Sequence, residues 1–161
     1  MRNVPRCSVW PVHASAPKFA PASASLLDWD WTLALLTASR NAWLATVRPD
    51  GRPHAAPLWL VVVEKAIWFW TLDTTTKGRN LAYDNHVVLH VESGDDVAII
   101  EGRAQRGEAT ANVLDAYMSK YDSSNLDPSA YWTIEVESAL AWQGHLGSAQ
   151  TNATRFTRLD Q

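Results

Sequence analysis

The sequence predicts a mainly β protein, an antiparallel β-barrel with flanking helices. Between residues 42 and 104, several apolar runs of strand length follow one another, separated by short turn signals. Helical periodicity is confined to a few short segments around these runs. Many strands at short spacing with few helices are typical of a barrel, whereas a doubly wound sheet alternates strands with helices.

The chain begins with a segment that lacks periodicity. Residues 1–24 are rich in proline, alanine and serine, so they have little apolar area to offset the entropy of ordering. We expect a loose or extended arm there and a single domain over residues 25–161. Ser25 or Asp28 can cap the first helix through its side-chain oxygen, and the apolar spacing predicts that this helix ends near 40–41.

Three strands follow this helix. Residues 43–47 form the first, and a Pro-Asp-Gly turn leads into the second, 53–63. The second strand contains Pro53 and Pro57, which cannot donate to a ladder, so their ring nitrogens should face away from a neighbouring strand. A Glu-Lys turn and the aromatic run 66–72 complete a hairpin.

The rest of the chain predicts further strands and a second helix. Residues 86–92 and 97–106 are expected to pair as strands, and residues 108–121 have the spacing of an amphipathic helix. A long strand over 131–142 and a short closing strand over 154–159 complete the domain. No internal repeat is present.

Bulk composition excludes several classes of protein. The net charge of −3 disfavours a general binder of nucleic acid or anionic membranes. The longest apolar run, residues 58–63, is far shorter than the roughly 20 residues of a membrane span. A single cysteine, Cys7, excludes an intrachain disulfide, and we expect a cytoplasmic protein.

One polar interruption stands out among the strands. The stretch TLDTTTKGRNL, residues 71–81, combines hydroxyl groups, Lys77 and Arg79 at the expected start of a helix. Free backbone N–H groups at a helix start, the helix dipole and cationic side chains all favour an anion. Alone, the stretch is either a phosphate site or an ordinary polar loop.

No side-chain pattern indicates acid–base, nucleophilic or metal chemistry. His86 and His90 share a strand face without a carboxylate at metal-ligand spacing, and the serines lack the glycines of a nucleophile elbow. His54 is a candidate to line a pocket, because it lies beside the central strand and titrates near neutral pH. Nine tryptophans either fill the core and an interface or flank a flat ligand. A cofactor would therefore have to carry any reaction.

The central stretch resembles a known family. The DGRPH turn, the TKGRNL loop and the GDDVAIIEGRA hairpin, in this order, resemble the pyridoxamine 5'-phosphate oxidase-like, FMN-binding split-barrel superfamily. Within it, the sequence is most similar to the flavin- and deazaflavin-dependent oxidoreductases. The resemblance runs from about residue 30 to the end. It implies a six-stranded antiparallel split β-barrel that forms a homodimer, with cofactor sites at the subunit interface.

The resemblance also implies roles for particular residues. The strand–loop–helix element would hold the cofactor phosphate, and its matching positions are Trp70, Thr71, Thr76, Lys77, Arg79 and Asn80. The cofactor ring would lie along a strand whose matching positions are Pro57, Leu58, Trp59 and Leu60. Trp142 and Arg155 match an aromatic and a basic residue that the partner subunit contributes.

These observations lead to one hypothesis and an alternative. We expect an oxidoreductase that binds FMN or a deazaflavin (coenzyme F-420) and transfers a hydride to or from a small organic substrate, with His54 on the substrate side. Thr75-Thr76-Lys77 replaces the Ser-Arg-Lys of true pyridoxamine phosphate oxidases, which argues against that activity. The alternative is a non-catalytic protein that binds or carries flavin or haem.

Overall fold

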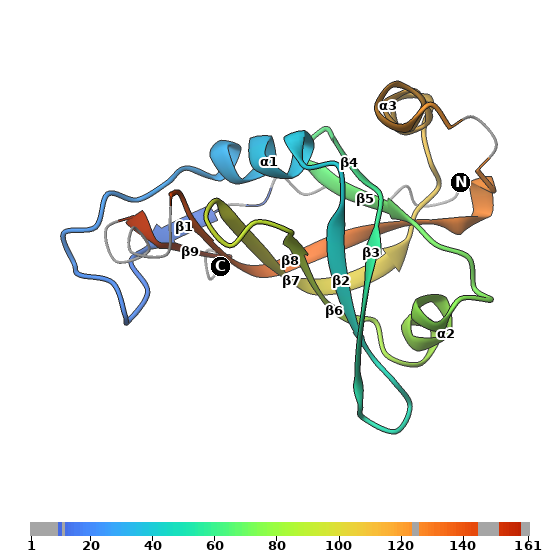
Figure 1. Cartoon of the computed structure of the whole chain (residues 1–161), viewed down its shortest axis with the longest axis horizontal. Coiled ribbons are helices and arrows are strands. Elements are labelled where there is room, and N and C mark those ends of the chain that lie inside the picture. Colours follow the sequence, from blue (N-terminus) through green and yellow to red (C-terminus); the bar gives the residue numbers. More distant parts are fainter. Residues whose placement is uncertain (1–9, 11, 124–125, 145–151, 159–161) are drawn as a thin grey trace.

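The apolar runs fold into one antiparallel sheet that curls around a core (Figure 1). A computed structural model describes residues 10, 12–123, 126–144 and 152–158. The sheet has nine strands, and its main path runs in the order β1-β9-β8-β7-β6-β2-β3, while β5 pairs with both β4 and β8. The strands are β1 (Val12–Ser15), β2 (Ala42–Val47), β3 (Pro53–Leu58), β4 (Leu60–Val63), β5 (Ala66–Trp70), β6 (His86–Val91), β7 (Val97–Arg106), β8 (Tyr131–Trp142) and β9 (Thr154–Arg158).

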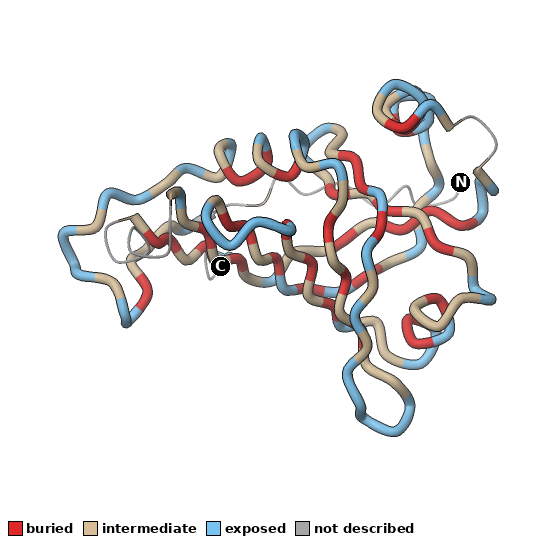
Figure 2. Tube along the Cα trace, in the orientation of Figure 1, coloured by how far each residue is buried: buried red, intermediate tan, exposed pale blue. Residues whose placement is uncertain are grey.

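Side-chain alternation along the strands produces the core. In β2, Ala42, Leu44 and Thr46 are buried, while the intervening residues are half-buried. Leu36 of the first helix, Phe69 of β5 and other fully buried residues join them. Figure 2 shows this buried interior, and it shows that the loop between β2 and β3 is exposed.

The predicted strand 53–63 is interrupted at Trp59, which separates β3 from β4. Helix α3 (Ala111–Tyr121) causes the break by contacting the backbone there. The hydroxyl of Tyr121 accepts from the N–H of Leu60 at 2.9 Å, and the hydroxyl of Tyr117 donates to the carbonyl of Trp59 at 3.0 Å. These groups are therefore bonded to α3 instead of continuing a ladder.

The break changes the strand count. If β3 and β4 are taken as one interrupted strand, β2 to β8 make the predicted six-stranded split barrel, and β1 and β9 are additions to it. Strand β1 belongs to the N-terminal arm that the sequence predicts over residues 1–24. Residues 12–15 of that arm are extended and pair antiparallel with β9.

Strand β3 lies at the end of the main path and leaves one of its edges unpaired among the described strands. Its partner on the other side is β2, with Pro53 opposite Val47 and Pro57 opposite Trp43. Proline is tolerated at such an edge because no neighbouring strand needs its N–H. The prediction that the two prolines face away from a neighbour is thus confirmed.

The helices are shorter than predicted. Helix α1 (Trp29–Ala38) is capped by Asp28, as expected, and it ends slightly early, because the backbone of Ser39 is extended. Helix α2 (Thr76–Tyr83) follows β5, and α3 begins at Ala111 rather than at residue 108. In the described part of the chain, no helix is long and apolar enough to cross a membrane.

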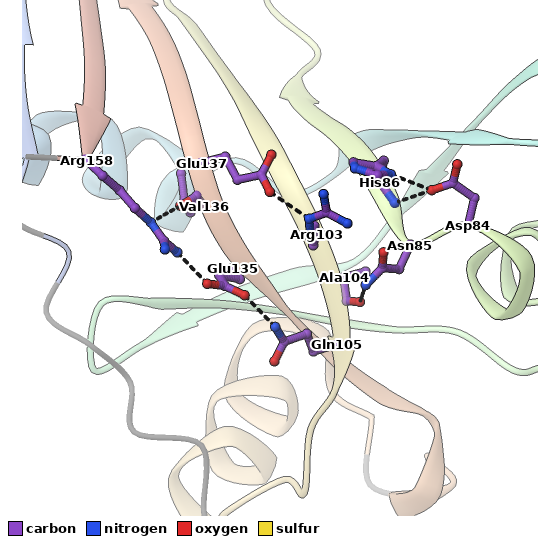
Figure 3. Close-up of polar contacts among 10 residues, drawn as sticks. All are labelled: Asp84, Asn85, His86, Arg103, Ala104, Gln105, Glu135, Val136, Glu137 and Arg158. Atoms are coloured by element: carbon purple, nitrogen blue, oxygen red, sulfur yellow. Dashed lines mark hydrogen bonds and ion pairs between the residues drawn. The ribbon is translucent and has the colours of Figure 1, made fainter. Parts of the chain in front are cut away.

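The outer face of β6 to β9 carries a band of paired polar side chains (Figure 3). Arg103 bonds Glu137 at 2.8 Å, and Glu135 accepts from both Gln105 and Arg158 at 2.6 Å. The backbone N–H and the ring of His86 lower the pKa of the Asp84 carboxyl. We call this set of residues the polar band: Asp84, His86, Arg103, Gln105, Glu135, Glu137 and Arg158.

Candidate functional site

A groove of about 450 Å³ runs beside β3, between that strand and the segment from β5 to α2. In the order of the chain, Asn41, Trp43, Pro57, Leu58, Trp59, Trp70, Thr71, Thr75, Lys77, Glu92 and Leu126 line this groove. Residues predicted from two separate stretches, Pro57 to Trp59 and Trp70 to Lys77, thus meet in one cavity. Six of the lining residues are apolar or aromatic, and the polar ones form two sets. Thr71, Thr75 and Lys77 lie at or near the start of α2, and Asn41 and Glu92 lie beyond the ends of β2 and β6.

The start of α2 closes one end of the groove. Thr75 caps the helix, because its hydroxyl accepts from the N–H of Gly78 at 3.0 Å and donates to the carbonyl of Leu72 at 2.8 Å. The Thr71 hydroxyl lies 2.9 Å from that of Thr75. The next first-turn amides, those of Thr76 and Lys77, have no intrahelical acceptor. This end therefore offers N–H donors beside two ordered hydroxyls.

Gly78 explains why α2 can lie so close to the loop before it. A methyl group at Gly78 would overlap the carbonyl oxygen of Leu72 and the Cα of Asp73. Both are backbone atoms, which cannot rotate away as a side chain can. The glycine of TKGRNL is thus required for packing, in addition to any role toward a ligand.

Lys77 is the unpaired cation of the groove. In the described ranges it has neither a hydrogen bond nor an ion pair, and its partial burial lowers the pKa of its ammonium group. A half-buried charge without a partner costs free energy. An anionic ligand would remove that cost, so Lys77 fits a phosphate group at this end.

Asn80 has a structural partner. Its buried amide donates to the Thr46 hydroxyl at 2.9 Å, which ties α2 to β2. The ring Nδ1 of His54 lies 3.4 Å from the same hydroxyl. Partial burial, Arg48 and Lys77 together lower the pKa of His54, which keeps the ring neutral near pH 7. His54 is thus close to Lys77 but does not line the main groove.

Arg79 and Thr76 face a second cavity, of about 330 Å³, between α2 and the β2–β3 loop. Arg79 donates to the carbonyl of Thr74 at 2.6 Å, so part of its hydrogen-bonding capacity stabilises the loop. Asn80, Arg48 and Arg52 contribute to the same cavity. The residues predicted to bind one phosphate are therefore divided between two adjoining cavities.

Trp59 forms an aromatic wall that α3 supports. Its ring stacks on Tyr121 with centroids 4.5 Å apart and an interplanar angle of 9°. Lys120 donates to the carbonyl of Leu60 at 3.0 Å, and burial lowers the pKa of Lys120 to about 8. Trp59 is 37% exposed, a large value for a tryptophan whose backbone is fixed in this way. Its outer surface is available to a ligand.

The opposite end of the groove was not predicted. Ala42 pairs with Val91 across β2 and β6, and this register brings Asn41 close to Glu92 just beyond the strand ends. The two residues are far apart in sequence and belong to no motif, so only the pairing register identifies them. Trp43 and Leu126 are the other lining residues beyond those predicted, whereas Thr75 belongs to the polar stretch 71–81.

Besides His54 and the residues of the second cavity, three more predicted residues do not line the groove. Leu60 is fully buried in the core. Trp142 ends β8, where it pairs with Val97, and its enclosed indole nitrogen has no partner in the described part of the chain. Arg155 lies in β9 between Leu140 and Ser15. In a single chain, neither Trp142 nor Arg155 reaches the groove.

The barrel and its groove define a split-barrel protein, and comparison with known families agrees. Residues 30–143 match the pyridoxamine 5'-phosphate oxidase family. Because this match covers well over half of the chain, the protein belongs to that family, as its sequence motifs predict. A comparison with curated proteins finds no match.

Solved structures from several bacteria share the fold. A conserved hypothetical protein from Mycobacterium tuberculosis has 22% identity and a TM-score of 0.65, over 77% of this chain and 89% of that one. General stress protein 26 from Bacillus anthracis has 15% identity and a TM-score of 0.60, over 83% and 100%. A haem-binding protein from Mycobacterium smegmatis has 20% identity and a TM-score of 0.60, over 71% and 53%. At these identities, the likeness shows the fold alone.

Proposed function

We propose that the protein is an oxidoreductase that binds FMN or coenzyme F-420 in the β3 groove and transfers a hydride to or from a small organic substrate. The observation that carries the proposal is Lys77, a half-buried cation without a partner, located at the start of α2 and at one end of an aromatic groove. The family match supports a flavin-type cofactor. When bound, the cofactor would supply the hydride chemistry.

The chain's own residues would bind and orient the cofactor. Lys77 and the first-turn amides of α2 suit a phosphate, since charge-assisted bonds at a helix start are favourable. The ring system would lie against Pro57 and Trp59, which form a flat apolar wall. Trp59 is suited to this task because Tyr121 holds it in place, so little side-chain entropy is lost on binding.

A haem-binding function is less well supported by the groove. Haem iron needs an axial ligand such as histidine, cysteine, methionine or tyrosine. None of the described residues that line the groove is of these types. A flavin carrier without turnover would use the same contacts as the enzyme, and assays of turnover distinguish the two.

We further propose that the chain acts as a homodimer. The groove is open on one side, and Trp142 and Arg155 lie away from it in their own chain. A second copy could bring these residues to the groove and enclose the cofactor. Light scattering at micromolar concentration is expected to give the mass of a dimer, and the mass of a monomer would contradict this proposal.

Titration with FMN and with coenzyme F-420 tests the cofactor site. Lys77→Ala should weaken the binding of the true cofactor at least about tenfold, because a charge-assisted bond contributes about 1.5–3 kcal/mol. Lys65→Ala is the matched control, because Lys65 is exposed and pairs with Asp30 at 2.8 Å, away from the groove. Equal affinities for the wild type and Lys77→Ala would show that the phosphate site is elsewhere.

A further inference from the structure

The two ends of the groove differ in charge. Lys77 and the start of α2 form a cationic end, while Glu92 and Asn41 form an acidic and amide-bearing end. Between them the wall is apolar and aromatic, with Trp43, Pro57 and Trp59. A ligand that fits this pattern has an anionic end, a flat apolar middle and a different polar group at its far end.

The polar side chains at the far end resemble Lys77 in having no polar partner among the described residues. In the part of the chain that the structure describes, the side chains of Glu92 and Asn41 have no hydrogen bond or ion pair. Asp96 in the same turn differs, since its carboxylate accepts from the N–H of Gly144 at 2.8 Å. The unpaired groups in the groove are therefore found at both of its ends.

Strand β2 runs from the acidic end of the groove toward α2 and gives a length scale for the separation of the two ends. Asn80 ties α2 to Thr46 on β2, while Asn41 precedes the first residue of the same strand. At about 3.3 Å per residue, the stretch from Thr46 to Asn41 spans roughly 16 Å. A ligand that contacts both ends must therefore be elongated, as a phosphorylated ring system with a linking chain is.

We propose that Asn41 and Glu92 recognise a neutral hydrogen-bonding edge of the ligand, an N–H group flanked by carbonyls on a planar heterocycle. This inference rests on the proposed function, because flavins and deazaflavins both carry such an edge on the pyrimidine ring, at one end of the ring system and away from the central-ring nitrogen that bears the phosphate chain. The carboxylate of Glu92 accepts from the N–H, and the Asn41 amide donates to a flanking carbonyl.

The same pair selects against other ligands. An ionised carboxylate only accepts hydrogen bonds, so a ligand with an anion at the far end meets charge repulsion and finds no donor from Glu92. Ligands with carboxylates at both ends are therefore disfavoured. Asn41 and Glu92 thus recognise the ring edge, whereas Lys77 binds the phosphate.

The test compares FMN with FMN methylated on the ring N–H, using the full chain. The wild type should bind FMN about tenfold more tightly than the methylated form, because the methyl group removes the donor that Glu92 accepts. In Glu92→Ala, the two ligands should bind with similar affinity. Asp95→Ala is the matched control, since it removes a negative charge from the same β6–β7 turn without touching the groove.

Each outcome has a distinct meaning. If Glu92→Ala and the wild type discriminate equally between the two ligands, Glu92 does not recognise the ring edge and this inference is wrong. The proposed cofactor site is not contradicted by that result. If Asp95→Ala loses discrimination as fully as Glu92→Ala, the effect is one of general charge and the inference also fails. If the wild type binds neither FMN nor coenzyme F-420, the proposed function fails and this inference fails with it.

Discussion

The polar band on β6 to β9 and the groove beside β3 differ in whether their charged side chains have partners. In the polar band, Arg103, Glu135 and Arg158 each have a partner on a neighbouring strand (Figure 3). In the groove, Lys77 and Glu92 have none within the described residues. The band is an exposed surface on a regular sheet, whereas the groove lies where the sheet is interrupted.

This difference separates groups that stabilise the fold from groups that are left for a ligand. Exposed ion pairs contribute about 0–1 kcal/mol each, so the polar band adds little and can vary without loss of the fold. A half-buried lysine without a counter-ion lowers the stability of the free protein. Such a cost is expected at a binding site, where the ligand supplies the missing partner.

The largest expected effect is on the packing of α2 against the groove. Gly78→Ala should lower the free energy of unfolding by about 3 kcal/mol, the upper end for overpacking, because the added methyl meets backbone atoms. Gly94→Ala, in the turn between β6 and β7, has open space around its Cα and should change stability by less than about 0.5 kcal/mol. Urea denaturation measures both, and equal midpoints would contradict the role given to Gly78.

A smaller effect is expected at the aromatic wall. Tyr121→Phe keeps the stack with Trp59 but leaves the buried N–H of Leu60 without its acceptor, which should cost about 1–3 kcal/mol of stability. Cofactor affinity should change little in this variant. Tyr121→Leu also removes the stack, so it should weaken cofactor binding as well. Denaturation and titration measure the two effects, and equal cofactor affinity in Phe and Leu variants would show that the stack does not position Trp59.

The pH dependence of binding distinguishes the unpaired lysine from the paired charges. Burial lowers the pKa of Lys77 below the 10.5 of a free lysine, so its charge is present at neutral pH and is lost as the pH rises through the lowered value. Cofactor affinity should fall by up to about tenfold over that range. Lys77→Arg keeps its charge and should bind with constant affinity there. A parallel fall in both proteins would assign the titration to another group.

The same lysine affects stability with the opposite sign. Between the lowered pKa and 10.5, the unfolded chain binds more protons at Lys77 than the folded chain does. This group therefore makes the free energy of unfolding rise with pH across that window. The affinity for an anion and the stability of the free protein should thus change in opposite directions.

The smallest effect is expected in the polar band. Arg103→Ala removes an exposed pair with Glu137 and should lower stability by about 0.2–1 kcal/mol. Cofactor affinity should not change, because neither residue reaches the groove. A loss of cofactor affinity in Arg103→Ala, measured by the same titration, would show that the band and the groove are coupled.

Local sequence signals were sufficient for much of this architecture. Turn residues and apolar runs placed the strands, and Asp28 caps α1 as its side-chain chemistry predicts. The TKGRNL stretch was correctly placed at a helix start, because hydroxyl, cation and glycine act locally there. Pro57 and Lys77 were likewise predicted from motifs, and both line the groove.

The remaining features depend on contacts between distant parts of the chain. The break at Trp59 requires Tyr117 and Tyr121, which a later helix brings to the strand. The meeting of Asn41 with Glu92 requires the register between β2 and β6. No local pattern contains this information, since a shift in register by one residue would reverse which side chains share a face.

The two prolines of β3 have a consequence for assembly. An unpaired strand edge normally acts as a template on which another chain can add a strand, which leads to uncontrolled association. Pro53 and Pro57 remove N–H groups from β3, so a regular ladder cannot form along its open edge. A small ligand can still contact this edge, because it needs only a few backbone groups. The second subunit that we propose would therefore cover the groove through side-chain packing, without extending the sheet.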